Sequence, residues 1–189
     1  MSRAQLLPLP LAGGRSVRGR RRAGFTLIEI LAVVVILGIA SAIIVPQISS
    51  RDDQKAASAA RVVMADLLYA QNRAIATQKT HYIVFDTGSQ TYRIFDTMSP
   101  PTMIKHPVTG ANYQTLFGSA STSGLTQMQL NAANFDSQNI LAFDAMGIPY
   151  SYNSSTGLAS LNSGNIVVKS GAYQMTVTVS PFSGELTVH

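Results

Sequence analysis

One carboxylate, Glu29, lies inside the most apolar stretch of the chain. Residues Phe25 to Val45 form a run of 21 residues in which Glu29 carries the only charge. A charged side chain costs about 3 kcal/mol to place at the centre of a membrane helix, and such residues are usually paired and functional. The run contains no lysine or arginine. No side chain within the run can therefore neutralise Glu29.

The segment before the run combines basic charge with a glycine. It contains no acidic residue and six arginines, namely Arg3, Arg15, Arg18, Arg20, Arg21 and Arg22. A basic segment directly before an apolar run is typical of a targeting signal, and it keeps this end on the cytoplasmic side. Gly24 has no Cβ, so a protease can approach its backbone closely. Cleavage after Gly24 would leave an amine at Phe25, which Glu29 of the same or of a neighbouring subunit could neutralise.

Three simpler interpretations of this end are a secretory signal peptide, a plain membrane anchor and a buried core helix. The small residues Ala40-Ser41-Ala42 offer the cleavage site that a signal peptide needs. Arg21 and Arg22 suit a plain anchor with these residues in the cytoplasm. Glu29 argues against all three, because none of these segments has a use for a carboxylate in its apolar run.

Eleven consecutive residues resemble the class III signal of type IV pilins and type II secretion pseudopilins. They read Arg21-Arg22-Ala23-Gly24-Phe25-Thr26-Leu27-Ile28-Glu29-Ile30-Leu31. The resemblance implies that a prepilin peptidase and N-methyltransferase cuts after Gly24 and methylates Phe25. It also implies that Glu29 serves filament assembly with other pilins or pseudopilins, where a buried ion pair can set subunit registry. The 24-residue leader is longer than is usual in the family.

Gly38 and Pro46 lie where helix-weakening residues occur in many pilins. A proline inside a helix removes one backbone hydrogen bond and clashes with the preceding turn. One interpretation is a simple kink at this place. The other, which the resemblance implies, is that residues 38–46 unwind on assembly so that helices can pack.

An amphipathic helix is predicted after the apolar run. From Arg51 to about Lys79, apolar residues recur at three- and four-residue spacing and form the stripe Val63, Leu67, Ala70 and Ala74. We expect this helix to continue the apolar helix past Pro46. The apolar run is about 31 Å long as a helix, close to the thickness of a bilayer core.

The remainder of the chain is rich in strand-forming residues. His81–Asp86 and Thr91–Asp96 predict a β-hairpin around a four-residue loop. Further strands are predicted at residues 139–144, 148–152, 165–169, 173–179 and 185–188, with a turn at 181–184 and a long loop at 100–124. The predicted fold is α+β: a long N-terminal helix, half transmembrane and half amphipathic, packed on an antiparallel sheet domain, which is the pilin fold. The expected segments are a leader (1–24), a membrane and filament helix (25–46), an amphipathic helix (47–80) and a β-rich periplasmic domain (81–189).

Enzymatic chemistry is not indicated. The chain has no cysteine, and its three histidines, His81, His106 and His189, are scattered without acids or bases at the spacing of a metal site or a catalytic triad. We expect no enzyme activity, no cofactor and no metal. We also expect no nucleic acid partner, because the excess of positive charge lies in the leader and residues 141–189 contain one basic residue, Lys169.

Three segments resemble the H-type minor pseudopilins and the related FimT-like minor pilins. They are residues 143–149, with the order Phe, Asp, two residues, Gly, one residue, Pro; the terminal hairpin at 177–186; and the helix segment 66–76. The resemblance implies a minor subunit of the type II secretion pseudopilus, anchored once in the inner membrane with its C-terminal domain in the periplasm. The alternative is a minor type IV pilin that acts in pilus assembly, adhesion or DNA uptake.

Overall fold

The computed structural model describes residues 24–49, 51–121 and 124–189, with the backbone alone for 42–49 and 120. The chain divides into two compact units at Pro46 and Gln47, and each is described separately. The predicted leader, residues 1–24, lies outside the described residues except for Gly24. Among the residues that are described, no helix is both long and apolar enough to cross a membrane.

Two helices occupy the region where one continuous helix was predicted. The first, α1 (Leu27–Ser49), includes both Gly38 and Pro46. The second, α2 (Asp52–Thr77), begins after Arg51, whose φ of −100° and ψ of 33° lie outside the helical range. Asp52 and Asp53 favour a helix start here, because carboxylates in the first turn interact well with the positive end of the helix dipole. The unwinding of residues 38–46 on assembly stays a prediction.

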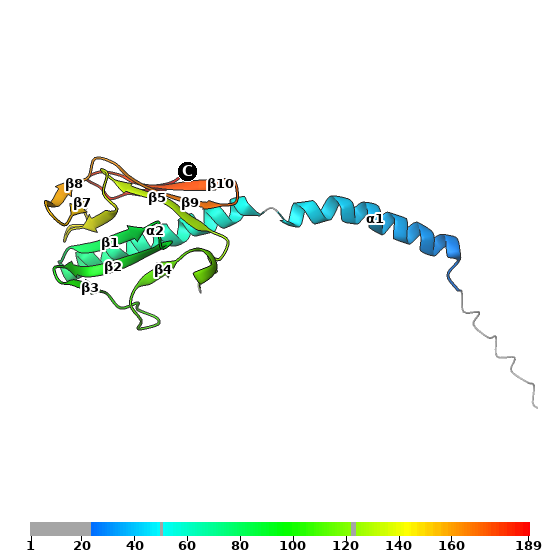
Figure 1. Cartoon of the computed structure of the whole chain (residues 1–189), viewed down its shortest axis with the longest axis horizontal. Coiled ribbons are helices and arrows are strands. Elements are labelled where there is room, and N and C mark those ends of the chain that lie inside the picture. The colour runs from blue at the N-terminus through cyan, green and yellow to red at the C-terminus, as the bar shows by residue number, and fades with distance from the viewer. Residues whose placement is uncertain (1–23, 50, 122–123) are drawn as a thin grey trace, which may run out of the picture. The chain divides into compact units, whose positions relative to one another are not determined.

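The apolar stripe of α2 faces the sheets, as predicted. Its buried residues recur at three- and four-residue spacing: Ala56, Ala59, Ala60, Val63, Leu67, Ala70 and Ala74. The stripe packs against strands of both sheets (Figure 1). Most of these residues are alanines, so the backbone of the helix can approach the strands closely. The helix therefore packs against both sheets of the domain. The predicted α+β class is confirmed.

In the described residues, all strand pairs are antiparallel and form two sheets. The larger sheet has the order β3-β2-β1-β6-β7-β8, with β4 on the same edge of β2 as β3. Its strands are β1 (His81–Asp86), β2 (Thr91–Met98), β3 (Pro101–Met103), β4 (Gln114–Leu116), β6 (Ile140–Phe143), β7 (Pro149–Asn153) and β8 (Gly157–Ser160). The smaller sheet has the order β11-β10-β9-β5. It contains β5 (Gln129–Phe135), β9 (Gly164–Ser170), β10 (Tyr173–Val179) and β11 (Leu186–Val188).

The first hairpin has the predicted register. Tyr82 lies opposite Phe95, and Asp86 lies opposite Thr91, so the turn contains the four expected residues. The Asp86 carboxylate accepts hydrogen bonds from the backbone N–H groups of Gly88 (3.0 Å) and Ser89 (3.1 Å). A short aspartate side chain thus fixes the turn, which explains why the strands on either side meet in this register.

Residues 100–124 are not the long loop that was predicted. They contain β3, β4 and the short 3-10 helix η1 (Gly118–Ala120), and Lys105 and Asn112 form an isolated antiparallel bridge. Proline and glycine in this segment indicate chain reversals, but each strand between the reversals has three residues. Such strands are too short to show an alternating pattern. They form because they pair with the edge of β2.

Candidate functional site

The predicted processing site lies at the start of α1. Gly24 and Phe25 precede the helix, and the Phe25 side chain is 77% exposed. A Cβ added at Gly24 would have no neighbouring heavy atom within 4 Å. Within the described part of the chain, nothing encloses the bond that joins these residues. The geometry is compatible with the predicted cleavage, which stays a prediction.

Thr26 caps the first turn, a role that the sequence prediction did not include. Its Oγ1 accepts a hydrogen bond from the Glu29 backbone N–H at 3.3 Å, and its carbonyl oxygen accepts from the N–H groups of Glu29 and Ile30 at 3.1 and 3.2 Å. Thr26 and Glu29 therefore have the three-residue spacing of a capping box. The Glu29 carboxylate lies in the first turn, where the helix dipole favours negative charge. Thr-x-x-Glu was a readable signal for this cap.

The surface of α1 is apolar and uncovered. The exposed apolar residues from the start of the helix to residue 39 are Leu27, Ile28, Ile30, Leu31, Val33, Val34, Val35, Ile36, Leu37 and Ile39. They point in all directions around the helix, because they include consecutive residues. A helix that is apolar on all sides is normally buried in a large core or in a membrane. Within its own unit, no other described residue buries these side chains.

The three segments that resemble minor pseudopilins meet at one place in the domain. Gln71 of α2 donates a hydrogen bond from Nε2 to the carbonyl oxygen of Gly147, at 2.9 Å. Gly184, in the turn between β10 and β11, lies against the same pair. A Cβ added there would lie 2.5 Å from Gln71 Nε2 and 3.0 Å from the Gly147 oxygen. The helix and two distant turns therefore share one close contact.

Asp144 shapes the turn that carries Gly147. Its carboxylate accepts hydrogen bonds from the backbone N–H groups of Met146 (2.9 Å) and Ile148 (2.8 Å). Gly147 has a φ of +81°, a left-handed conformation that favours glycine. The preceding Phe143 is fully buried in the core. Phe143, Asp144 and Gly147 thus each have a structural role, and the segment presents the Gly147 carbonyl to Gln71.

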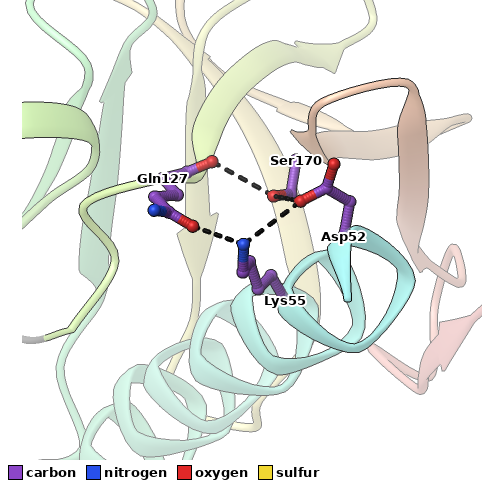
Figure 2. A network of polar contacts seen from close by, with 4 residues as sticks. All are labelled: Asp52, Lys55, Gln127 and Ser170. Carbon is purple, nitrogen blue, oxygen red and sulfur yellow. Dashed lines mark hydrogen bonds and ion pairs between the residues drawn. The ribbon is translucent and has the colours of Figure 1, made fainter. Parts of the chain in front are cut away.

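A polar network fixes the first turn of α2 (Figure 2). Lys55 Nζ contacts Asp52 Oδ1 at 3.2 Å and also donates a hydrogen bond to Gln127 Oε1. The Ser170 hydroxyl lies 3.3 Å from Asp52 Oδ1 and 3.1 Å from the Gln127 carbonyl oxygen. The Asp52 carboxylate also lies against Gly171, where a side chain would collide with it. Two segments distant in sequence thus hold the end of α2 that is nearest in sequence to α1.

The predicted residues fall into two groups. Gly24, Phe25 and Glu29 lie together at the start of α1, whereas Gly38 and Pro46 lie further along the same helix. The histidines do not come together: His81 begins β1, His106 stacks on Tyr113 with ring centres 4.7 Å apart, and His189 is exposed. Within residues 24–49, 51–121 and 124–189, no group of three or more acidic or histidine side chains could hold a metal ion.

Three comparisons with known proteins bear on these observations. Residues 19–45 match the family described as "Prokaryotic N-terminal methylation motif". Over 42 residues the chain is 57% identical to "Type II secretion system core protein G" of Pseudomonas aeruginosa, an alignment that covers 22% of this chain and 30% of that protein. The chain also has a structural likeness to the minor pseudopilin EpsH of Vibrio cholerae, with a TM-score of 0.47, 15% identity, and coverage of 71% of this chain and 96% of that one.

The curated relative is therefore matched over less than a third of its length. The strong sequence likeness is confined to a short part of the chain, and the N-terminal match at residues 19–45 contains the predicted cleavage bond and Glu29.

Proposed function

We propose that this chain is a structural subunit of a type II secretion pseudopilus. The basis is the N-terminal motif, which identifies the type IV pilin and pseudopilin family. A prepilin peptidase would cut after Gly24 and methylate Phe25. The processed chain would be held once in the inner membrane by residues 25–46, with residues 81–189 in the periplasm. It would then join other pseudopilins in a short filament that assists protein export. It would act as a building unit and not as an enzyme.

The observation that carries this proposal is the combination at the start of α1. A capped helix whose apolar side chains are exposed in every direction begins two residues after a candidate cleavage bond. Its one charged side chain within the apolar run is Glu29. Such a helix can be held in lipid before assembly and packed among other helices afterwards. The amine created at Phe25 would then supply the charge that Glu29 needs.

A minor, H-type position within the filament is the finer part of the proposal. It is supported by the contact of Gln71, Gly147 and Gly184, because these residues belong to the three segments that resemble H-type subunits. A shared contact explains why the three segments would occur together in one chain. The resemblance then reflects one structural unit instead of three unrelated turns and strands.

Deletion of the gene in its native host tests the proposal. We expect proteins that leave by type II secretion to accumulate in the periplasm, while pili and their motility remain. The wild-type gene should restore secretion, whereas Gly24→Val should not, because a Cβ-branched side chain at the cleavage bond leaves the precursor uncut. Normal secretion in the deletion strain, with loss of pili or of DNA uptake, would contradict the proposal.

A further inference from the structure

His81 is a buried histidine whose two ring nitrogens have different surroundings. Its side chain has no exposed surface, and Nδ1 lies 3.1 Å from the carbonyl oxygen of Lys79. A carbonyl oxygen can only accept a hydrogen bond, so Nδ1 carries the proton. In the neutral ring, Nε2 is then an acceptor. This nitrogen is one of two buried side-chain nitrogens without a hydrogen-bond partner in the described residues, the other being Arg73 Nε.

The group that faces Nε2 is a second acceptor. The nearest carboxylate oxygen, Asp96 Oδ1, lies 3.6 Å away, just beyond hydrogen-bond distance. Asp96 lies at an irregularity of β2, where the register with β3 shifts between Phe95 and Thr97. A bulge in a strand re-aims a side chain, and here it accompanies a carboxylate that faces His81. The Asp96 side chain is 39% exposed, so solvent can reach the contact from its side.

We propose that His81 and Asp96 form a proton-operated contact between β1 and the irregular end of β2, open while His81 is neutral and closed when Nε2 takes up a proton. The proton comes from solvent and converts Nε2 from an acceptor into a donor. Nε2–H then donates to Asp96 Oδ1, and the carboxylate moves closer to β1. Asp96 also lines a groove of about 400 Å³ together with Lys79, Tyr82 and Tyr152.

The charges around His81 set the pH at which the contact closes. Burial lowers the pKa of His81, the Lys79 carbonyl and Asp96 raise it in part, and the positive charges of Arg73 on α2 and of Lys79 lower it. The folded chain thus binds this proton less readily than the unfolded chain. Stability is present above the ordinary histidine pKa and falls as the pH drops through that value toward the lower folded value. The contact closes only in acid, at the expense of stability.

Nuclear magnetic resonance of the full-length chain in detergent micelles tests this inference, because the chain has only three histidines to assign. The ring signals of His81 and the exposed His189 are followed from mildly alkaline to mildly acidic pH. We expect the midpoint of His81 to lie below the ordinary histidine pKa. The backbone amide signals of Asp96 and Thr97 should shift with the same midpoint as His81.

Two variants separate this contact from a general effect of acid. Asp96→Asn removes the carboxylate and should shift the His81 midpoint further down, and the amides at positions 96 and 97 should no longer follow it. Asp53→Asn, on the exposed side of the first turn of α2, is the matched control and should leave the titration unchanged. A His81 midpoint at or above the ordinary histidine pKa would overturn the inference. So would amide signals at 96 and 97 that ignore His81, or an unchanged midpoint in Asp96→Asn.

Discussion

At Gly184 the domain accepts no side chain larger than a hydrogen atom. Its φ is +66°, and a Cβ there would meet both Gln71 Nε2 and the Gly147 oxygen. We expect Gly184→Ala to lower the free energy of unfolding by roughly 2 to 3 kcal/mol, the sum of the left-handed backbone penalty and a weakened Gln71 hydrogen bond. Thermal or denaturant unfolding measures the change.

Gly110→Ala is the matched control for this substitution. Gly110 has nearly the same φ, +68°, but a Cβ there would have no neighbour within 4 Å. Its cost should be the backbone penalty alone, about 1 kcal/mol. Equal losses in the two variants would mean that the contact with Gln71 and Gly147 contributes nothing to stability.

At the same scale, the sequence shows the local features around Glu29 but not the long-range contact of Gln71. Its charge and its apolar neighbours are visible in the sequence. The cap that Thr26 provides was equally readable from the spacing of a capping box. The contact of Gln71 with Gly147 was not, because it joins residues 76 positions apart and depends on how the helix meets two turns. Such contacts are set by tertiary packing, for which no local pattern exists.

At the scale of elements, two adjacent leucines of α2 test the packing of the helix on the sheets. Leu67 is 1% exposed and belongs to the buried stripe, whereas Leu68 is 40% exposed. We expect Leu67→Asp to cost roughly 4 kcal/mol, because it places an unpaired charge in the core. Leu68→Asp introduces the same charge one position along the same helix and should cost less than about 1 kcal/mol.

Circular dichroism during thermal unfolding distinguishes these two variants. Helix propensity changes equally in both, so any difference reports burial. Similar melting temperatures for Leu67→Asp and Leu68→Asp would contradict the packing of the stripe against the strands.

The elements that could be predicted are those with a strong local pattern. The strand β10 matches the predicted residues 173–179, and the hairpin of β1 and β2 has its predicted register. The strands β5 and β8 were missed, since Gln129–Phe135 and Gly157–Ser160 contain no β-branched residue. Their pairing with β9 and β7 creates them. The network that joins the first turn of α2 to Gln127 and Ser170 was also missed, because no local sequence shows it.

At the scale of the whole molecule, substitutions of Glu29 distinguish processing from assembly. We expect Glu29→Gln to be cleaved and inserted normally, because the residues at the cut and the apolar character of the helix are retained. Export should fall, since a neutral side chain cannot pair with the amine of a neighbouring subunit. Glu29→Ala should behave alike, which would show that charge and not size matters. Immunoblots for cleavage and assays of exported protein are measured on the same cultures.

Full export with Glu29→Ala, at normal levels of processed protein, would contradict an intersubunit role of this carboxylate. Thr26→Ser is a control variant, because it changes the residue three positions before Glu29 but keeps the hydroxyl that caps the helix. It should be cleaved and should support export as the wild type does.

The N-terminus of the mature protein is the most direct test of cleavage after Gly24 and methylation of Phe25. The measurement is mass spectrometry of the N-terminal peptide from protein extracted from membranes of its native host. We expect a chain that begins at Phe25 and carries one added methyl group on its amine. A chain that begins at Ile43, after the small residues Ala40-Ser41-Ala42, would indicate an ordinary signal peptidase and would contradict the account. An uncut chain that still begins at Met1 would contradict it equally.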